Sequence, residues 1–318
     1  MSSSNKRSES ENGNAPAVIA WDYQFAPNGQ KARNLLSATG IAYSICEQPI
    51  VKPRPILLQL GITYRRIPVC SIGKDVYCDA GSFVAAVQDI FKDKALPTGP
   101  ADHAFEAWGY RSFRIALTLV DANLITKPMQ DDRRELFGGL FDREDYATLR
   151  PSGLAEMRDL LDTVENQFIG QGGPWINGEK VGVADIHAIW CVKWVLQMLG
   201  VDKEPGFSRD DFPKVYRWIE GLPAHTPENE APKLGADEAT EKLLASEYAA
   251  EDIGVDPNDP TGLKAGADVV VEANDDAEPG ISRQEGKLVG LQKREVVLEL
   301  DNGLRLHFPR IGFVLKGV

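Results

Sequence analysis

The run from Tyr64 to Asp79, YRRIPVCSIGKDVYCD, limits the folds open to this chain more than any other stretch. Pro68 follows Ile67 within it, and proline offers no N–H to a sheet ladder, so the run is not a plain central strand. An X-Pro bond followed at once by an alternating apolar run is a candidate cis peptide. The segments VCSIG and DVY then predict two short strands around a Gly73-Lys74-Asp75 turn.

Asp79 comes directly after the second of these strands, and we expect it to cap a helix. The helix places its apolar residues on one face: Phe83, Val84, Val87, Ile90 and Phe91. Two structures fit this run, an ordinary β-hairpin followed by a helix or the second half of a thioredoxin-like domain. The order of elements in the rest of the chain decides between them.

Length and composition allow two globular domains and a small third one. The chain has 318 residues, of which 43% are hydrophobic, and a formal net charge of -12. This acidic balance argues against nucleic acid or an anionic membrane as the main partner. No apolar run approaches the roughly 20 residues of a membrane-spanning helix, and the first residues lack the apolar core of a secretory signal. We expect a small-molecule partner, with no nucleic acid and no membrane.

The cysteines and histidines form no metal-binding or redox motif. The chain has 4 cysteines, which form no CxxC pair and have no histidine nearby at metal-ligand spacing. We therefore expect no metal site, and we expect buried thiols in a reducing compartment, most simply the cytosol. The chain also lacks HExxH and a GxGxxG loop after a strand.

The first predicted domain covers residues 17–95, after a polar tail over 1–16 that we expect to be disordered. Its elements follow the order strand, helix, strand, helix, strand, strand, helix. That is the order of a thioredoxin-like fold, so the second of the two structures is favoured.

A helical pattern and then a strand pattern follow. Residues 100–250 form the second predicted domain, with helices expected over 101–123, 152–168, 183–199, 213–222 and 237–250. Over residues 263–318 the period changes to two, which predicts five short strands in a small all-β domain with a hairpin turn at Asp301-Asn302-Gly303. The predicted fold class is α+β.

A thioredoxin-like half followed by an all-helical half resembles the soluble glutathione S-transferase family. Three local matches carry the resemblance: Ile67-Pro68-Val69 at the family's cis-proline step, Asp79 at the next helix start, and GVADIHAIW from Gly182 to Trp190. The last resembles a buried helix whose aspartate, here Asp185, caps its own N-terminus. The resemblance covers about residues 18–222 and implies a homodimer.

A finer resemblance links the chain to a fungal subgroup of transferase-like proteins with an extra C-terminal β-domain. It rests on the segments RPILLQLGITYRRIPV, DVYCD, DDRRELFG and HFPRIGF. Many members of this subgroup belong to secondary metabolism or detoxification, and the resemblance implies such a role here.

The family needs a hydroxyl or thiol after the first strand to lower the pKa of the glutathione thiol. Ala26-Pro27 stands where the subgroup has Ser-Pro, so this hydroxyl is absent. Tyr23 and Asn28 flank the gap and are the candidate replacements. Asn28 either donates an amide N–H to the sulfur or merely caps the following helix.

The expected glutathione-binding positions are also altered. The backbone at Ile67 and Pro68 would pair with the cysteinyl part, and Asp79-Ala80 stands where the family has an acid and a serine for the γ-glutamyl group. Ala80 keeps the backbone N–H but lacks the hydroxyl, and such a lost hydrogen bond costs about 1.5–3 kcal/mol. Lys52 and Arg54 either contact the glycyl carboxylate or are solvated loop charges.

The first long helix supplies the second substrate pocket in this family. Its candidates here are Trp108, Tyr110, Arg111 and Arg114. The two arginines are three residues apart and share a face, so they would hold an anionic or carbonyl-bearing substrate, or else form ion pairs at the domain interface.

Two functions follow from the resemblance. One is a glutathione S-transferase-like enzyme with a degraded glutathione site, in which glutathione is a weakly held cofactor. A variant of this hypothesis is an enzyme of the same fold that does not use glutathione and acts as an isomerase, lyase or cyclase. The other is a non-catalytic binding or scaffold protein.

Overall fold

The computed structural model describes residues 15–169, 173–223, 231–251, 253–274, 280 and 282–318. Most of the tail expected over 1–16 lies outside the described residues. The N-terminal elements appear in the predicted order: β1 (Val18–Asp22), α1 (Pro27–Thr39), β2 (Ser44–Glu47), α2 (Pro55–Gln59), β3 (Val69–Ile72), β4 (Asp75–Tyr77) and α3 (Ala80–Ile90).

The strands of this domain form a sheet with a core on each face. β1 pairs in parallel with β2 and antiparallel with β3. Because side chains alternate along a strand, Val18 and Ala20 of β1 enter the core shared with α1 and α3. Ile19 and Trp21 enter a second core on the opposite face, with residues of α2 and α9 (Ala236–Ala245).

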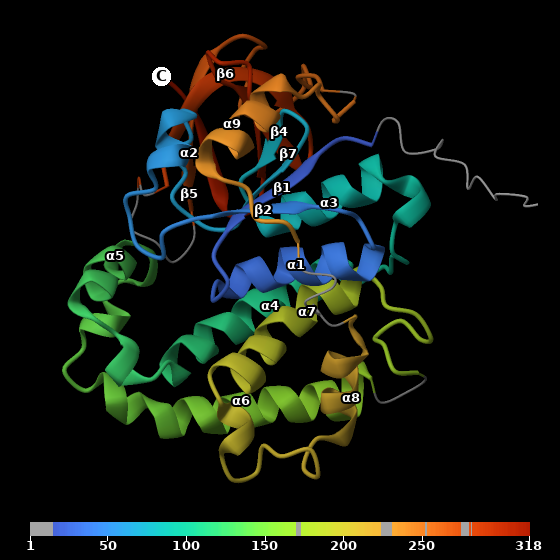
Figure 1. Ribbon diagram of the computed structural model, residues 1–318, viewed down its shortest axis with the longest axis vertical. Helices are drawn as coiled ribbons and strands as arrows, with labels where there is room; N and C mark the ends of the chain where they lie inside the picture. The colour runs from blue at the N-terminus through green and yellow to red at the C-terminus, as the bar shows by residue number, and fades with distance from the viewer. Residues whose placement is uncertain (1–14, 170–172, 224–230, 252, 275–279, 281) are drawn as a thin grey trace, which may run out of the picture.

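The helical half packs on α1, which lies between the sheet and the helices α4 and α7 (Figure 1). The predicted central helix is confirmed, because α7 is buried along nearly its whole length. Asp185 caps it as expected, since its Oδ2 accepts from Gly182 N at 2.9 Å. The helices are α4 (Asp102–Ala116), α5 (Lys127–Phe137), α6 (Arg150–Thr163), α7 (Val183–Lys193) and α8 (Pro213–Gly221).

Two predicted helices, α4 and α9, end earlier than expected, and α9 ends at Ala245 instead of residue 250. α4 ends at Ala116 and passes into a 3-10 turn over Leu117–Leu119, whereas we expected a helix to residue 123. α6 and α7 continue as π-helical turns, Val164–Phe168 and Trp194–Met198. The apolar spacing stays nearly helical through such turns, so the pattern does not reveal the change of hydrogen bonding.

The C-terminal strands extend the N-terminal sheet. β8 pairs in parallel with β4, with Leu306 opposite Val76, and the result is a nine-stranded sheet in the order β2-β1-β3-β4-β8-β7-β6-β5-β9. Figure 1 shows these strands (orange to red) beside the thioredoxin-like half. They are β5 (Asp268–Ala273), β6 (Gln284–Leu291), β7 (Glu295–Glu299), β8 (Arg305–Pro309) and β9 (Phe313–Gly317).

A buried histidine between two carboxylates fastens this junction. His307 Nε2 lies 2.9 Å from Asp75 Oδ1, and its Nδ1 lies 3.0 Å from Glu295 Oε1. Asp75 Oδ2 accepts from Ala249 N at 2.7 Å and from Ala250 N at 2.8 Å. One carboxylate therefore ties β4 both to β8 and to the segment that leaves α9.

Among the described residues, no helix has the length and apolar character needed to cross a bilayer, and no group of three or more His, Cys, Asp or Glu side chains is placed to hold a metal ion.

Candidate active-site cleft

The loop after β1 is positioned by a buried ion pair. The guanidinium of Arg33, on α1, contacts the carboxylate of Asp22, at the end of β1. The same guanidinium donates to Gln24 O at 3.0 Å and to Ala26 O at 3.3 Å. Burial lowers the pKa of Arg33 to about 10, which leaves it charged at neutral pH. This pair fixes where Tyr23 enters the cleft.

The cis-proline step and the capped helix are both present. The Ile67-Pro68 bond is cis, as predicted, and the Lys52-Pro53 bond is cis as well. Asp79 caps α3, because its Oδ1 accepts from Gly81 N at 2.6 Å. Ile67 and Asp79 line one cleft, so the structure brings these predicted residues together.

α4 forms one wall of the cleft with a stripe of residues three or four apart. Its first part is polar and contributes Glu106 and Tyr110. Its second part contributes Phe113 and Arg114, and Leu117 follows in the 3-10 turn. The cleft therefore has a polar end at the start of α3 and an apolar end beside α5.

The apolar end is enclosed by aromatic and aliphatic side chains from several elements. Phe113 packs edge-on against Phe137 and is tilted against Trp194, with ring centroids 6.0 Å apart in both pairs. Such a lining suits a ligand with an apolar body. The apolar lining comprises Phe25, Phe113, Leu117, Val120, Met129, Leu136, Phe137, Phe141 and Trp194.

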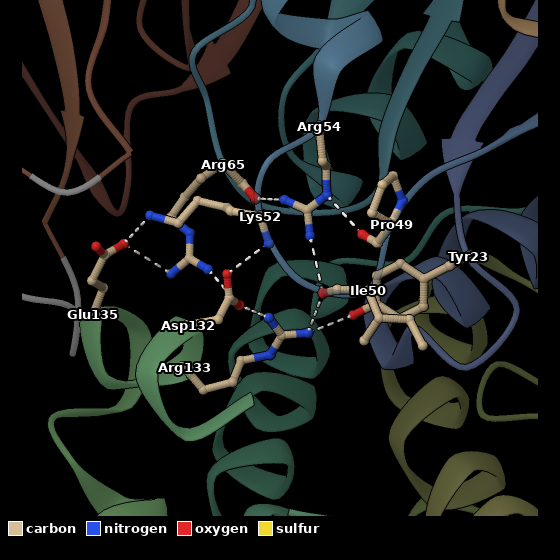
Figure 2. Close-up of polar contacts among 9 residues, drawn as sticks. All are labelled: Tyr23, Pro49, Ile50, Lys52, Arg54, Arg65, Asp132, Arg133 and Glu135. Atoms are coloured by element: carbon tan, nitrogen blue, oxygen red, sulfur yellow. Dashed lines mark hydrogen bonds and ion pairs between the residues drawn. The ribbon is translucent and has the colours of Figure 1, made fainter. Parts of the chain in front are cut away.

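A cluster of cations lies where α5 meets the segment between β2 and α2 (Figure 2). Arg133 Nη2 donates to the hydroxyl of Tyr23 at 3.1 Å and to Ile50 O at 2.9 Å. Its other nitrogen contacts the carboxylate of Asp132. Arg133 and Tyr23 both line the cleft, so a guanidinium supports a phenol at the edge of the apolar end.

The predicted glycyl-carboxylate residues are engaged within this cluster. Lys52 Nζ lies 2.6 Å from Glu135 Oε2, and its backbone N–H donates to Asp132 Oδ1 at 2.9 Å. Arg54 donates to the backbone carbonyls of Pro49, Ile50 and Arg65. Burial lowers the pKa of Arg54 to about 10, so it stays charged. The role of Lys52 and Arg54 toward a ligand carboxylate remains a prediction.

The neighbouring arginines Arg65 and Arg66 both line the cleft. Arg65 Nη2 lies 2.8 Å from Asp132 Oδ2, so Arg65 binds the helical half. Arg66 is half-buried and lines the cleft. Burial lowers the pKa of Arg65 to about 10, and the carboxylate of Glu135, at 3.4 Å, acts in the opposite direction.

Some candidates lie elsewhere than expected. Arg114 lines the cleft, but Arg111 is exposed and outside the lining. Trp108 also lies outside it and packs against Phe168, with ring centroids 5.0 Å apart. Both differences follow from the turn of α4, because the cleft receives the stripe that contains residues 102, 103, 106, 107, 110, 113, 114 and 117.

The residues after β1 also differ from expectation. Asn28 is not the helix cap: α1 begins at Pro27 after Ala26, and no side chain caps it. Asn28 lines the cleft with a buried Oδ1 that has no hydrogen-bond partner in the described part of the chain. Ala26 is buried and lies behind the lining, while Ala80 is buried at the first position of α3.

The polar end contains a network that the sequence reasoning missed. Lys31, on α1, is fully buried and its Nζ lies 2.9 Å from Glu106 Oε1. Tyr110 donates to Asp79 Oδ2 at 3.2 Å, and Lys31 Nζ lies 5.1 Å from the centre of its ring. Burial would raise the pKa of Glu106, but the Lys31 ammonium, together with His187 and His103, outweighs burial and lowers the pKa to about 2. The spacing of 106 and 110 on one helix face was a signal, but Lys31 gave none.

Known proteins resemble this chain in sequence and in fold. A family described as a domain of unknown function (DUF7962) matches residues 116–230. The probable glutathione S-transferase parC of Nicotiana tabacum is 25% identical over 181 residues, 56% of this chain and 72% of that protein. Glutathione S-transferase U3 of Arabidopsis thaliana is 21% identical over 203 residues, 62% of this chain and 80% of that protein.

Solved structures extend the likeness. A GST-like protein from Pseudomonas syringae aligns with a TM-score of 0.65 at 22% identity, over 95% of this chain and 100% of that one. A glutathione S-transferase of Ceriporiopsis subvermispora, solved in complex with glutathione, aligns with a TM-score of 0.52 at 16% identity, over 67% of this chain and 100% of that one. The chain has the glutathione S-transferase fold and is a distant relative of that family by sequence.

Proposed function

We propose that this chain is a glutathione S-transferase-like enzyme with a degraded glutathione site, which acts on a small electrophilic or carbonyl-bearing metabolite at the apolar end of the cleft. One observation carries the proposal: the Tyr23 hydroxyl accepts a hydrogen bond from Arg133 at 3.1 Å while both residues line the cleft. A polar pair at the edge of an apolar pocket is the arrangement that orients a small ligand.

The chemistry follows from the direction of this hydrogen bond. Because the phenolic oxygen accepts from Arg133, its own hydrogen is directed elsewhere and is available to a ligand. A phenol backed by a guanidinium stabilises negative charge that develops on a substrate carbonyl oxygen. The role suits addition of a nucleophile to an enone, and equally an isomerisation or elimination through an enolate.

Local charge supports an electron-rich ligand. The residues drawn in Figure 2 include the cations Lys52, Arg54, Arg65 and Arg133 and the carboxylates Asp132 and Glu135. An excess of positive charge at a partly dry cleft attracts an anionic or carbonyl group, even though the whole chain carries a net charge of -12.

Two residues at the expected glutathione-binding positions argue against plain glutathione conjugation. Ala26 and Ala80 have no hydroxyl at the positions where the resemblance implies one. Asn28 lines the cleft and is the remaining candidate for activating a thiol there. The alternative is a glutathione-independent isomerase, lyase or cyclase in which Tyr23 and Arg133, with Arg114 on the same cleft, act on the substrate alone.

The proposal also includes features supported by the sequence resemblance alone. These are a homodimer, a cytosolic location and a role in fungal secondary metabolism. A non-catalytic binding protein would use the same cleft without turnover.

The test uses anilinonaphthalene sulfonate, a fluorescent probe with an aromatic body and one anionic group. The variants are Arg133→Met and Tyr23→Phe, and the control is Arg143→Met, which removes an exposed arginine paired with Asp145. A lost hydrogen bond to a charged group costs about 1.5–3 kcal/mol, so Arg133→Met should raise the Kd by about tenfold or more. Tyr23→Phe should raise it by a smaller factor.

An Arg133→Met variant that binds the probe like wild type would refute the assignment of the site. Turnover is tested separately with glutathione and a chlorinated nitrobenzene. Conjugation by wild type that survives in Tyr23→Phe but is lost in Asn28→Ala would place the chemistry on Asn28, whereas loss in Tyr23→Phe supports the phenol.

A further inference from the structure

The polar end of the cleft is occupied by an ion pair from the chain itself. Lys31 has no exposed side-chain surface, and its Nζ lies 2.9 Å from Glu106 Oε1, whose side chain is 22% exposed. A fully buried ammonium is stable only with a close counter-charge, so this contact is a requirement of the fold. Glu106 reaches it from α4, and Lys31 from α1.

The Glu106 carboxylate lies against the N-terminus of α3. A Cβ placed on Gly81 would be 2.1 Å from Glu106 Oε1, so the carboxylate touches the backbone of the first helical turn. The N-terminus of a helix is where an anion is most favourably held, because free N–H groups and the helix dipole face it. Glu106 thus places a negative charge beside the first turn of α3, while the Gly81 N–H donates to Asp79 Oδ1.

The Lys31 ammonium lies beside the groups that would hold a ligand cation. Its Nζ is 5.1 Å from the ring centre of Tyr110, and the Tyr110 hydroxyl donates to Asp79 Oδ2 at 3.2 Å. Asp79 uses its other oxygen to cap α3. An aromatic face and a carboxylate form a common receptor for an ammonium group.

The neighbouring histidine adds no charge to this pair. His187 is buried, with Nδ1 3.7 Å from Glu106 Oε1. Burial and the nearby Lys31 ammonium lower the pKa of His187 to about 3, so it is neutral at physiological pH. Lys31 and Glu106 therefore pair as one cation with one anion, in the charge arrangement of an α-amino acid head group.

We propose that Lys31 and Glu106 are specificity-determining residues that fill an amino-acid subsite from within the chain, so that the cleft rejects γ-glutamyl thiols such as glutathione and takes its ligand only at the Tyr23 end. A ligand head group carrying an ammonium and a carboxylate would need the Asp79–Tyr110 corner for the first and the start of α3 for the second. Lys31 lies beside the first place, with its Nζ 5.1 Å from the Tyr110 ring centre, and Glu106 lies against Gly81 at the second. The inference rests on the proposed function, which places the ligand at the apolar end of the cleft.

The first experiment compares glutathione with cysteinylglycine, the same thiol without its γ-glutamyl group, by calorimetry. Wild type should bind glutathione no more tightly than cysteinylglycine. The double variant Lys31→Ala/Glu106→Ala vacates both places, and its preference for glutathione should be tenfold or more, as expected for about one charge-assisted hydrogen bond. Glu156→Ala, an exposed glutamate on α6, is the control. A tenfold preference for glutathione in wild type overturns the proposal.

A second experiment does not depend on thiol binding. Glu106→Ala leaves the buried Lys31 ammonium unpaired, and a small carboxylate should replace the missing one. Sodium formate at about ten times its Kd should raise the Tm of Glu106→Ala by about 3 °C relative to sodium chloride at equal ionic strength, and leave wild type unchanged. Glu106→Gln keeps the space filled and should show no such rise.

The outcomes separate this inference from the proposed function. If formate has no effect on a folded Glu106→Ala variant, or raises the Tm of Glu106→Gln equally, the subsite assignment is wrong. If the variants do not fold, the wild-type comparison of the two thiols decides alone. Anilinonaphthalene sulfonate reports only the Tyr23 end: its failure to bind would refute the proposed function while leaving the thiol and formate results standing.

Discussion

Replacing Arg33 by methionine should be among the most destabilising single changes in the N-terminal domain. The guanidinium of Arg33 contacts the carboxylate of Asp22, which is 1% exposed. Asp22 Oδ1 has no hydrogen-bond partner among the residues that the structure describes, so the pair depends on the other oxygen. Methionine preserves most of the side-chain volume and leaves the carboxylate buried without a counter-charge.

The magnitude follows from these contacts. Removing one partner of a buried ion pair costs about 3–5 kcal/mol, because the remaining charge stays out of water. The carbonyls of Gln24 and Ala26 also lose their hydrogen bonds to Arg33. We therefore expect the free energy of unfolding to fall by about 3–5 kcal/mol, a large share of the stability of an ordinary domain.

Urea unfolding at pH 7, followed by circular dichroism, measures this change. The double variant Asp22→Asn/Arg33→Met also removes the unpaired buried carboxylate. It should recover at least about 1 kcal/mol of the lost free energy of unfolding. Arg143→Met, on an exposed pair, should change the free energy of unfolding by less than about 0.5 kcal/mol. A loss below about 1 kcal/mol for Arg33→Met, or a double variant as unstable as the sum of the single variants, would refute the reasoning.

Two further predictions concern the junction and the polar end. Burial alone would lower the pKa of His307, but its hydrogen bonds to Asp75 and Glu295 outweigh burial and raise it above 6.5. Protonated His307 between Asp75 and Glu295 therefore stabilises the fold fully below pH 6.5, and this contribution is lost as pH rises through the folded pKa. Urea unfolding between pH 6 and 9 should show that wild type is more stable than His307→Gln by an amount that shrinks with rising pH. A difference in the free energy of unfolding that stays constant over this range would contradict the prediction. Gly81→Ala should lower the free energy of unfolding by about 1–3 kcal/mol, because its Cβ would lie 2.1 Å from Glu106 Oε1. Glu106→Ala should remove most of that penalty when the two changes are combined, and equal penalties in both backgrounds would show that the contact is absent.

The sequence predicted those parts of the fold that depend on local chemistry. The proline after Ile67, the capping carboxylate of Asp79 and the Asp185 cap act within a few residues, and all three are as expected. The five short strands expected over residues 263–318 were also found, as β5 to β9. The continuity of their sheet with β4 was not visible, because the pairing of Val76 with Leu306 joins distant segments.

The site was less predictable for the same reason. Only the folded chain brings Arg133 to the Tyr23 hydroxyl, 110 residues away in sequence. Lys31 carried no signal in sequence, since a lysine on a helix is usually solvated. Arg111 was expected in the cleft with Arg114, but a spacing of three residues spans an arc wide enough for one to line the cleft and the other to face solvent.

The pairing of β8 with β4 has a consequence for how this chain is made. A ribosome releases β4 (Asp75–Tyr77) long before β8 (Arg305–Pro309), so the outer edge of the first sheet stays open through most of translation. An open edge invites pairing with a neighbouring chain. A nascent copy is thus exposed to aggregation until β8 emerges, and a message cut short before residue 305 would yield a product with that edge permanently unpaired.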